Sequence, residues 1–141
     1  MRARRGEPDK FAEWVREAYL EIPKRLRRRI ANVAVVVEDE PSADDLRRAR
    51  CPRDVTLLGL YHGIPLTQRT SSYGMVLPDR ISIYRGPIAR LARDEKEAQR
   101  IVKETLWHEV GHYFGMDEQQ VRRAEQRWRK KVQRSKFQVQ S

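Results

Sequence analysis

The sequence predicts an α+β domain in which a small mixed β-sheet packs against helices near the two ends of the chain. Three observations indicate this class: a helical pattern after Pro8, three short strand-like segments in the middle, and two helix-start signals in the last third. Because the strands follow one another without a helical pattern of similar length between them, an alternating βαβ arrangement is not expected.

The first helix is predicted from apolar residues that recur at helical spacing between Phe11 and Ile22. Pro23 interrupts this pattern, and residues 24–30 are expected to add a short helical turn. The strands are predicted at 32–38, 56–61 and 80–85, from β-branched residues or from alternation of apolar and polar residues. The charged connection 39–54 is expected to be exposed, with about one turn of helix.

Two capping signals predict the last two helices. Asp94 with Glu97 should begin a long helix toward His112, and Asp117 with Gln120 should begin a helix to about Val132. These helices would complete the order helix, three strands, helix, helix.

Charge and cysteine content limit the function classes. The chain has 141 residues and a net charge of +10, but residues 1–30 and 121–141 carry the excess of Lys and Arg, whereas residues 31–120 hold twelve basic and fourteen acidic side chains. The lone Cys51 cannot form an intramolecular disulfide or a cysteine-based zinc site. No long apolar run or secretory leader is evident, so we expect a cytoplasmic protein that does not span a membrane.

The strongest chemical signal is the pattern H-E-x-x-H at residues 108–112. On a helix, residues four apart lie about 40° from each other around the axis, so His108 and His112 can bind one Zn²⁺. Glu109 points to the side of this pair and is predicted to act as the general base toward the zinc-bound water. Three protein ligands and one water would make the site catalytic, with one zinc per chain.

Glu118 is the predicted third metal ligand, and Asp117 is the alternative. If the helix continued through residue 118, Glu118 would point away from His108, so the chain must turn at Gly115, which can adopt a positive φ. Asp117 can also be explained as a helix N-cap, and Glu118 as an acid in a first helical turn. With such a site, the expected reaction is hydrolysis of a peptide bond.

The sequence resembles the small bacterial zincin-like metallopeptidases, a minimal domain similar to matrix metalloproteases. The resemblance covers residues 11–125, through the zinc motif and segments 11–18, 22–23, 32–41, 57–69 and 77–88. It implies a minimal zincin-like fold, with a peptidase domain at 11–128 between a basic N-terminal extension (1–10) and a basic, flexible tail (129–141). The family position that matches Glu118 carries Asp in many members.

In zincins generally a substrate strand adds to a sheet edge above the zinc, and the candidate edge here is Ile81–Tyr84. Tyr61 and Tyr84 are candidate oxyanion donors or core aromatics, and the loop 67–74 could cover the cleft. His62 is expected to line a turn or a pocket, not to bind metal. The three tryptophans, Trp14, Trp107 and Trp128, are expected to be packing residues.

An alternative function is that of a non-catalytic protein with a zincin scaffold, which binds nucleic acid or another anionic partner through its basic C-terminal region. Eight Lys and Arg residues between 122 and 136 support it, but aromatic residues are sparse among them and no nucleic-acid motif accompanies them. A peptide or protein substrate is therefore the favoured partner.

Overall fold

The computed structural model describes residues 9–65 and 79–140, with side chains up to residue 131. The predicted α+β class is confirmed, with six helices and three strands in these residues. The elements are α1 (Lys10–Glu21), α2 (Lys24–Arg27), β1 (Val33–Glu38), α3 (Ala43–Arg48), β2 (Gly59–His62), β3 (Asp79–Tyr84), α4 (Arg85–Leu91), α5 (Glu95–Tyr113) and α6 (Glu118–Gln140).

The sheet is mixed, with the strand order β1-β3-β2. β1 pairs with β3 in parallel, and β2 pairs with β3 in antiparallel register, with Tyr61 opposite Ile81. The prediction that Ile81–Tyr84 forms the sheet edge is therefore wrong, because β3 has a neighbour on each side. The site-facing edge is β2.

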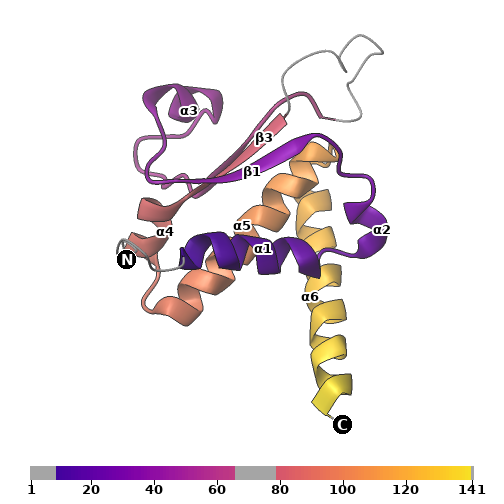
Figure 1. Ribbon diagram of the computed structural model, residues 1–141. Helices are drawn as coiled ribbons and strands as arrows, with labels where there is room; N and C mark the ends of the chain where they lie inside the picture. Colours follow the sequence, from indigo (N-terminus) through magenta and orange to yellow (C-terminus); the bar gives the residue numbers. More distant parts are fainter. Residues whose placement is uncertain (1–8, 66–78, 141) are drawn as a thin grey trace.

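Helices lie on both faces of the sheet (Figure 1). The side chains of Ile81 and Ile83 belong to the main hydrophobic core, together with residues of α1 and α5. On the opposite face the Tyr84 hydroxyl donates to the Asp45 carboxylate of α3 over 2.8 Å. Successive side chains of β3 point to opposite faces of the sheet, and because both faces are covered, the strand is buried on both sides. Its sequence, by contrast, alternates as in a strand with one buried face.

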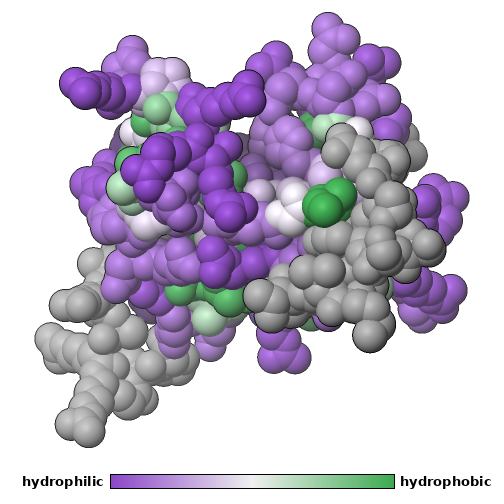
Figure 2. Space-filling model, turned by 90° about the horizontal axis from the view of Figure 1, so that it is seen from above, coloured by the Kyte–Doolittle hydropathy of each residue, from purple (hydrophilic) through white to green (hydrophobic). Residues whose placement is uncertain are grey.

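The core lies mainly between α1, α5 and the sheet. Trp107 of α5 is fully buried and donates from its indole N–H to the carbonyl of Ala18 in α1. Trp128 of α6 packs edge-on against Trp107, and Trp14 packs against the same cluster, so the three tryptophans are confirmed as packing residues. On the face shown in Figure 2, hydrophilic residues predominate and the hydrophobic residues form small, separate areas.

The last helix is longer than the sequence predicts, because α6 continues beyond Val132 to Gln140. Its far end extends beyond the other elements in Figure 1. Within residues 9–65 and 79–140, each helix is too short or too polar to cross a bilayer.

Candidate metal centre

The helix α5 carries the two histidines of the motif. Its N-cap is Asp94, whose side chain accepts the amide of Glu97 at 2.8 Å, as predicted. The second half of the predicted capping box differs, because the Glu97 carboxylate accepts the amide of Arg93 instead of that of Asp94. The apolar side of α5 is buried in the core, which leaves His108 and His112 partly exposed along one stripe.

Gly115 ends α5 with a φ of +81°, in the left-handed region that glycine adopts readily. The amide of Gly115 donates to the carbonyl of His112, and the amide of Met116 donates to the carbonyl of Gly111. These two bonds form a Schellman motif, which satisfies two carbonyls at the helix end and reverses the chain. The turn expected at Gly115 is therefore confirmed.

Asp117 is the N-cap of α6. Its carboxylate accepts the amide of Gln120, and the Gln120 side chain accepts the amide of Asp117, at 2.8 and 2.9 Å. The capping explanation of Asp117 thus holds. The helix α6, which begins at this cap, packs closely on α5. A Cβ added to Gly111 of α5 would lie only 2.6 Å from Cγ2 of Val121 in α6.

This close approach brings a carboxylate of α6 to the two histidines. Oε1 of Glu118 lies 3.3 Å from Nε2 of His108 and 3.2 Å from Nε2 of His112. Tetrahedral zinc with bonds of about 2.0–2.1 Å separates its ligand atoms by about 3.3–3.4 Å. Glu118 Oε1 thus lies from each of the two imidazole nitrogens at the separation of two ligand atoms on one zinc ion, and both atom types are ones that zinc binds. His108, Glu109 and His112 also form a group whose ligand atoms lie within 4.8 Å of one another.

Glu109 is buried beside the histidines and held by the edge strand. Its Oε1 accepts the backbone amide of Tyr61 at 2.8 Å, and only 8% of the residue is exposed. Burial raises the pKa of this carboxyl, against the opposing charges of His112 and His108. A carboxylate with a raised pKa is a better proton acceptor, which suits a general base.

Gly59 allows β2 to reach this carboxylate. A Cβ at this position would lie 2.6 Å from Thr105 Cγ2 and 3.0 Å from the carbonyl oxygen of Ser82. Only a residue without a side chain lets the strand pass this close to α5. The edge strand therefore depends on Gly59 for its position beside Glu109.

Glu125 is a site residue that the sequence analysis did not identify. Its Oε1 lies 3.4 Å from Nδ1 of His108, and its side chain is 12% exposed. The Glu125 carboxylate, opposed by burial, raises the pKa of His108. Helical spacing could have indicated this residue, since positions seven apart differ by only about 20° around the axis, and Glu118 is seven residues earlier.

A cleft of about 620 Å³ borders this group. Its lining includes His108, Glu109 and Glu125, the segment Thr56–Gly59 that leads into β2, and residues of α5 toward its N-terminus. The cleft therefore opens onto His108 and the buried Glu109 carboxylate, whereas His112 is not among its lining residues.

The side chains of the other sequence candidates have partners away from the two histidines of the motif. The Tyr61 hydroxyl donates to Asp79 and the Tyr84 hydroxyl to Asp45, so both tyrosines are engaged by carboxylates and the interpretation as core aromatics is favoured. His62 lies at the end of β2, 3.4 Å from Ser82 Oγ and 3.8 Å from Asp45 through the same nitrogen, Nε2. A serine–histidine–aspartate relay needs the two partners on opposite nitrogens, so this cluster is not one.

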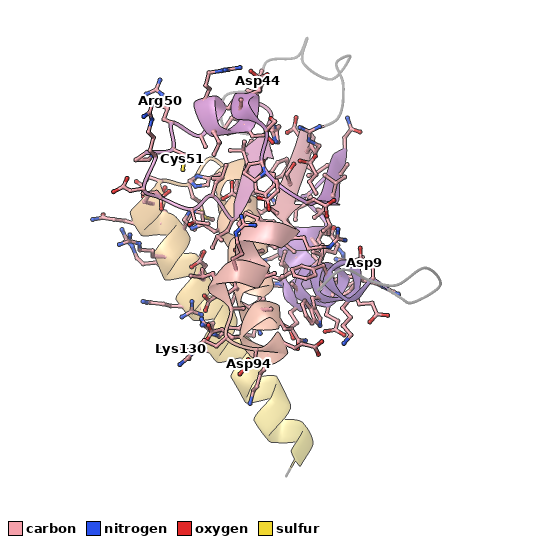
Figure 3. All side chains as sticks on the ribbon, turned by 90° about the vertical axis from the view of Figure 1, so that its left-hand side faces the viewer. Asp9, Asp44, Arg50, Cys51, Asp94 and Lys130 are labelled. Atoms are coloured by element: carbon pink, nitrogen blue, oxygen red, sulfur yellow. The ribbon has the colours of Figure 1, made fainter. Side chains whose placement is uncertain are left out.

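The predicted cover loop, 67–74, lies outside the described residues. The basic residues of α6 that are described lie mainly on its exposed side, at Arg122, Arg123, Arg127, Lys130 and Lys131. Figure 3 shows Lys130 near one end of the molecule and Asp44 of α3 at the other. The buried positions Val121, Ala124 and Trp128 occupy the opposite side of the helix.

The fold and site together define an α+β protein with a helix-borne H-E-x-x-H group. A family model for zincin-like metallopeptidases matches residues 30–128, which is more than half of the chain. The chain belongs to this family, as the resemblance implied.

Solved structures of similar fold include the following one. It is described as a conserved hypothetical protein from Thermo thermophilus, and it has 24% sequence identity and a TM-score of 0.51. The match covers 75% of this chain and 92% of that one. A search of curated proteins gives no significant match.

Proposed function

We propose that this protein is a zinc-dependent metallopeptidase that hydrolyses peptide bonds. The observation that carries this proposal is the convergence of His108 Nε2, His112 Nε2 and Glu118 Oε1, at spacings of 3.2–3.3 Å from the carboxylate oxygen. Membership of the zincin-like family supports the same reaction class.

The proposed ligands are His108, His112 and Glu118. Asp117 is the weaker candidate, because its carboxylate caps α6 through the amide of Gln120. Glu is longer than Asp by one methylene, and at this position its carboxylate lies within 3.3 Å of both imidazoles.

Glu109 is the proposed general base and acid. When bound, zinc would supply Lewis acidity, which polarises a substrate carbonyl and lowers the pKa of water toward about 7. The Glu109 carboxylate accepts the proton from the attacking water and later delivers it to the leaving amine. The Tyr61 amide holds this carboxylate through one oxygen, which leaves the other for the transfer.

The proposed substrate is an extended peptide that lies along β2. The amide of Tyr84 donates to the carbonyl of Leu58, which makes residues 58, 60 and 62 the positions whose backbone groups face β3. The backbone groups of Gly59 and Tyr61 then face outward, toward the cleft and Glu109. An added strand would place its own amides against this edge.

We assign residues 11–128 to the metallopeptidase domain. The family match begins at residue 30, but Phe11, Val15 and Ala18 of α1 are part of the same core as α5. The basic segments 1–10 and 129–141 lie outside this domain in our assignment. We also keep the proposal of a cytoplasmic setting, with which the lone Cys51 is consistent.

The test is a cleavage screen with a peptide library derived from a proteome. Protein stripped with a chelator should be inactive, should regain activity as zinc is added, and should saturate at one zinc per chain. Full zinc occupancy without cleavage of any library peptide would favour a non-catalytic scaffold. A chain that binds no zinc would contradict the proposal.

A further inference from the structure

A buried carboxylate of α6 faces the first histidine of the motif from the side opposite the proposed metal ligands. We propose that Glu125 is a positioning residue, which holds the His108 ring with its proton on Nδ1 and so keeps Nε2 free for the metal. The inference rests on the proposed zinc site and assigns a role to a residue outside its three ligands and its general base.

The geometry of His108 carries the first step. Its two ring nitrogens face two different carboxylates: Nε2 is 3.3 Å from Glu118 Oε1, and Nδ1 is 3.4 Å from Glu125 Oε1. A neutral imidazole has one N–H donor and one acceptor. Each carboxylate favours a proton on the nitrogen that it faces, so Glu118 and Glu125 compete for the proton while no metal is bound. When a metal takes the lone pair of Nε2, the proton is on Nδ1, where the Glu125 carboxylate can accept it.

The burial of Glu125 carries the second step. Its Oε1 is buried and makes no hydrogen bond to any group in the described part of the chain, so the approach of His108 Nδ1 at 3.4 Å is an ion-pair contact. The nearby Arg129 points its guanidinium to Glu104 of α5, with a contact of 2.8 Å. A buried carboxylate is costly unless a partner compensates it, and the partner within reach is the Nδ1 side of His108.

The helix α6 thus acts on the site at two points. Glu118 and Glu125 are two turns apart, and Val121 between them contacts the bare backbone at Gly111. The close packing of Val121 on Gly111 therefore lies between the ligand carboxylate and the carboxylate that faces Nδ1 of His108. Outer carboxylates of this kind fix the tautomer of a ligating histidine and strengthen metal binding.

The experiment uses the full chain and two readouts. One is the zinc affinity by competition with a chelating dye; the other is the ¹⁵N NMR shifts of the histidine rings without metal in a Glu118→Ala background, which removes the carboxylate that competes for the proton at Nε2. We compare the wild type with Glu125→Ala and Glu125→Gln, and we use Gln126→Ala as the control, since Gln126 is an exposed neighbour on α6. The NMR is recorded at a pH at which imidazoles are neutral.

In the metal-free Glu118→Ala background, His108 should be a single Nδ1–H tautomer. Adding Glu125→Ala to that background should mix the tautomers of His108 and leave those of His112 unchanged. Glu125→Ala in the wild-type chain should weaken zinc binding about 10–100-fold. Glu125→Gln should restore most of both properties, because its amide oxygen can still accept from Nδ1, and Gln126→Ala should match the wild type.

If Glu125→Ala changes neither the His108 tautomer in the Glu118→Ala background nor the zinc affinity of the wild-type chain, the inference is overturned and the zinc site is left intact. A wild type that binds no zinc would instead overturn the proposed function, and the metal-free spectra would still decide whether Glu125 holds Nδ1.

Discussion

The backbone amide of Tyr61 lies 2.8 Å from Oε1 of Glu109, so the edge strand of the sheet holds the proposed general base directly. The donor is a main-chain group of β2, and the acceptor is a side chain of α5. The position of the base thus depends on how closely β2 approaches α5.

Gly59→Ala should separate these two elements. The added Cβ would lie 2.6 Å from Thr105 Cγ2, so the strand or the helix must move. We expect a loss of about 1–3 kcal/mol in the free energy of unfolding of the metal-free protein, measured with denaturant. Peptide hydrolysis should fall further than zinc affinity, because the displaced group is the base.

The double variant Gly59→Ala/Thr105→Ser is the matched control for this clash. It removes Thr105 Cγ2 and should recover part of the stability, although the contact of 3.0 Å with the Ser82 carbonyl stays. A Gly59→Ala protein that is as stable and as active as the wild type would contradict the close approach of β2 to α5.

Substitutions of the adjacent residues Asp117 and Glu118 should affect different properties, the stability of the fold and the affinity for zinc. Asp117→Ala removes the cap of α6 and should lower the free energy of unfolding by about 0.5–2 kcal/mol with zinc affinity largely kept. Glu118→Ala should leave the metal-free stability nearly unchanged and weaken zinc binding by more than the roughly 100-fold cost of losing an outer partner. Denaturant unfolding and zinc competition give the two quantities, and the reverse pattern would make Asp117 the third ligand.

Much of the fold follows from local signals. Asp94 begins α5 and Gly115 ends it, through capping and a positive φ that depend on a few neighbouring residues. The pairing of β3 with both β1 and β2 was not predicted, because it depends on contacts between residues such as Val35 and Ile81, which are far apart in the chain.

The candidate site likewise contains some groups that the sequence indicates and others that only tertiary packing brings together. The spacing of His108 and His112 within one helix makes the pair visible in the sequence. Glu125 can be recognised as a site residue only once the packing of α6 on α5 is known. The donor at Tyr61 is a backbone amide, which every residue except proline possesses, so no residue type marks it in the sequence. Side-chain type therefore indicates the ligands, whereas the groups that hold them depend on tertiary packing.

The contact of Asp45 with the sheet predicts a pH dependence of stability. Burial alone would raise the pKa of Asp45, but hydrogen bonds from the Ser42 amide and the Tyr84 hydroxyl, together with His62, outweigh it and lower the pKa. A lowered pKa in the folded state means that the ionised group stabilises the fold above its ordinary pKa, near 3.9. This contribution is lost as the pH falls through the folded-state value.

Asp45→Asn should therefore cost about 1 kcal/mol in the free energy of unfolding near pH 6, and its difference from the wild type should shrink below about pH 4. Asp44→Asn is the matched control, since Asp44 is exposed on the same helix, at the outer end of the molecule in Figure 3. Urea unfolding between pH 3 and 7 measures both. An equal pH profile for the two variants would contradict the role of Asp45.

The most direct test of the catalytic account compares zinc-loaded wild type with Glu109→Gln at equal metal content, on a peptide that the wild type cleaves. The amide of Gln can still accept from the Tyr61 backbone but cannot take a proton from water. We predict one zinc per chain in both proteins and a fall in turnover of about 10²–10⁴-fold in the variant. Unchanged turnover by Glu109→Gln would contradict the assignment of Glu109 as the general base.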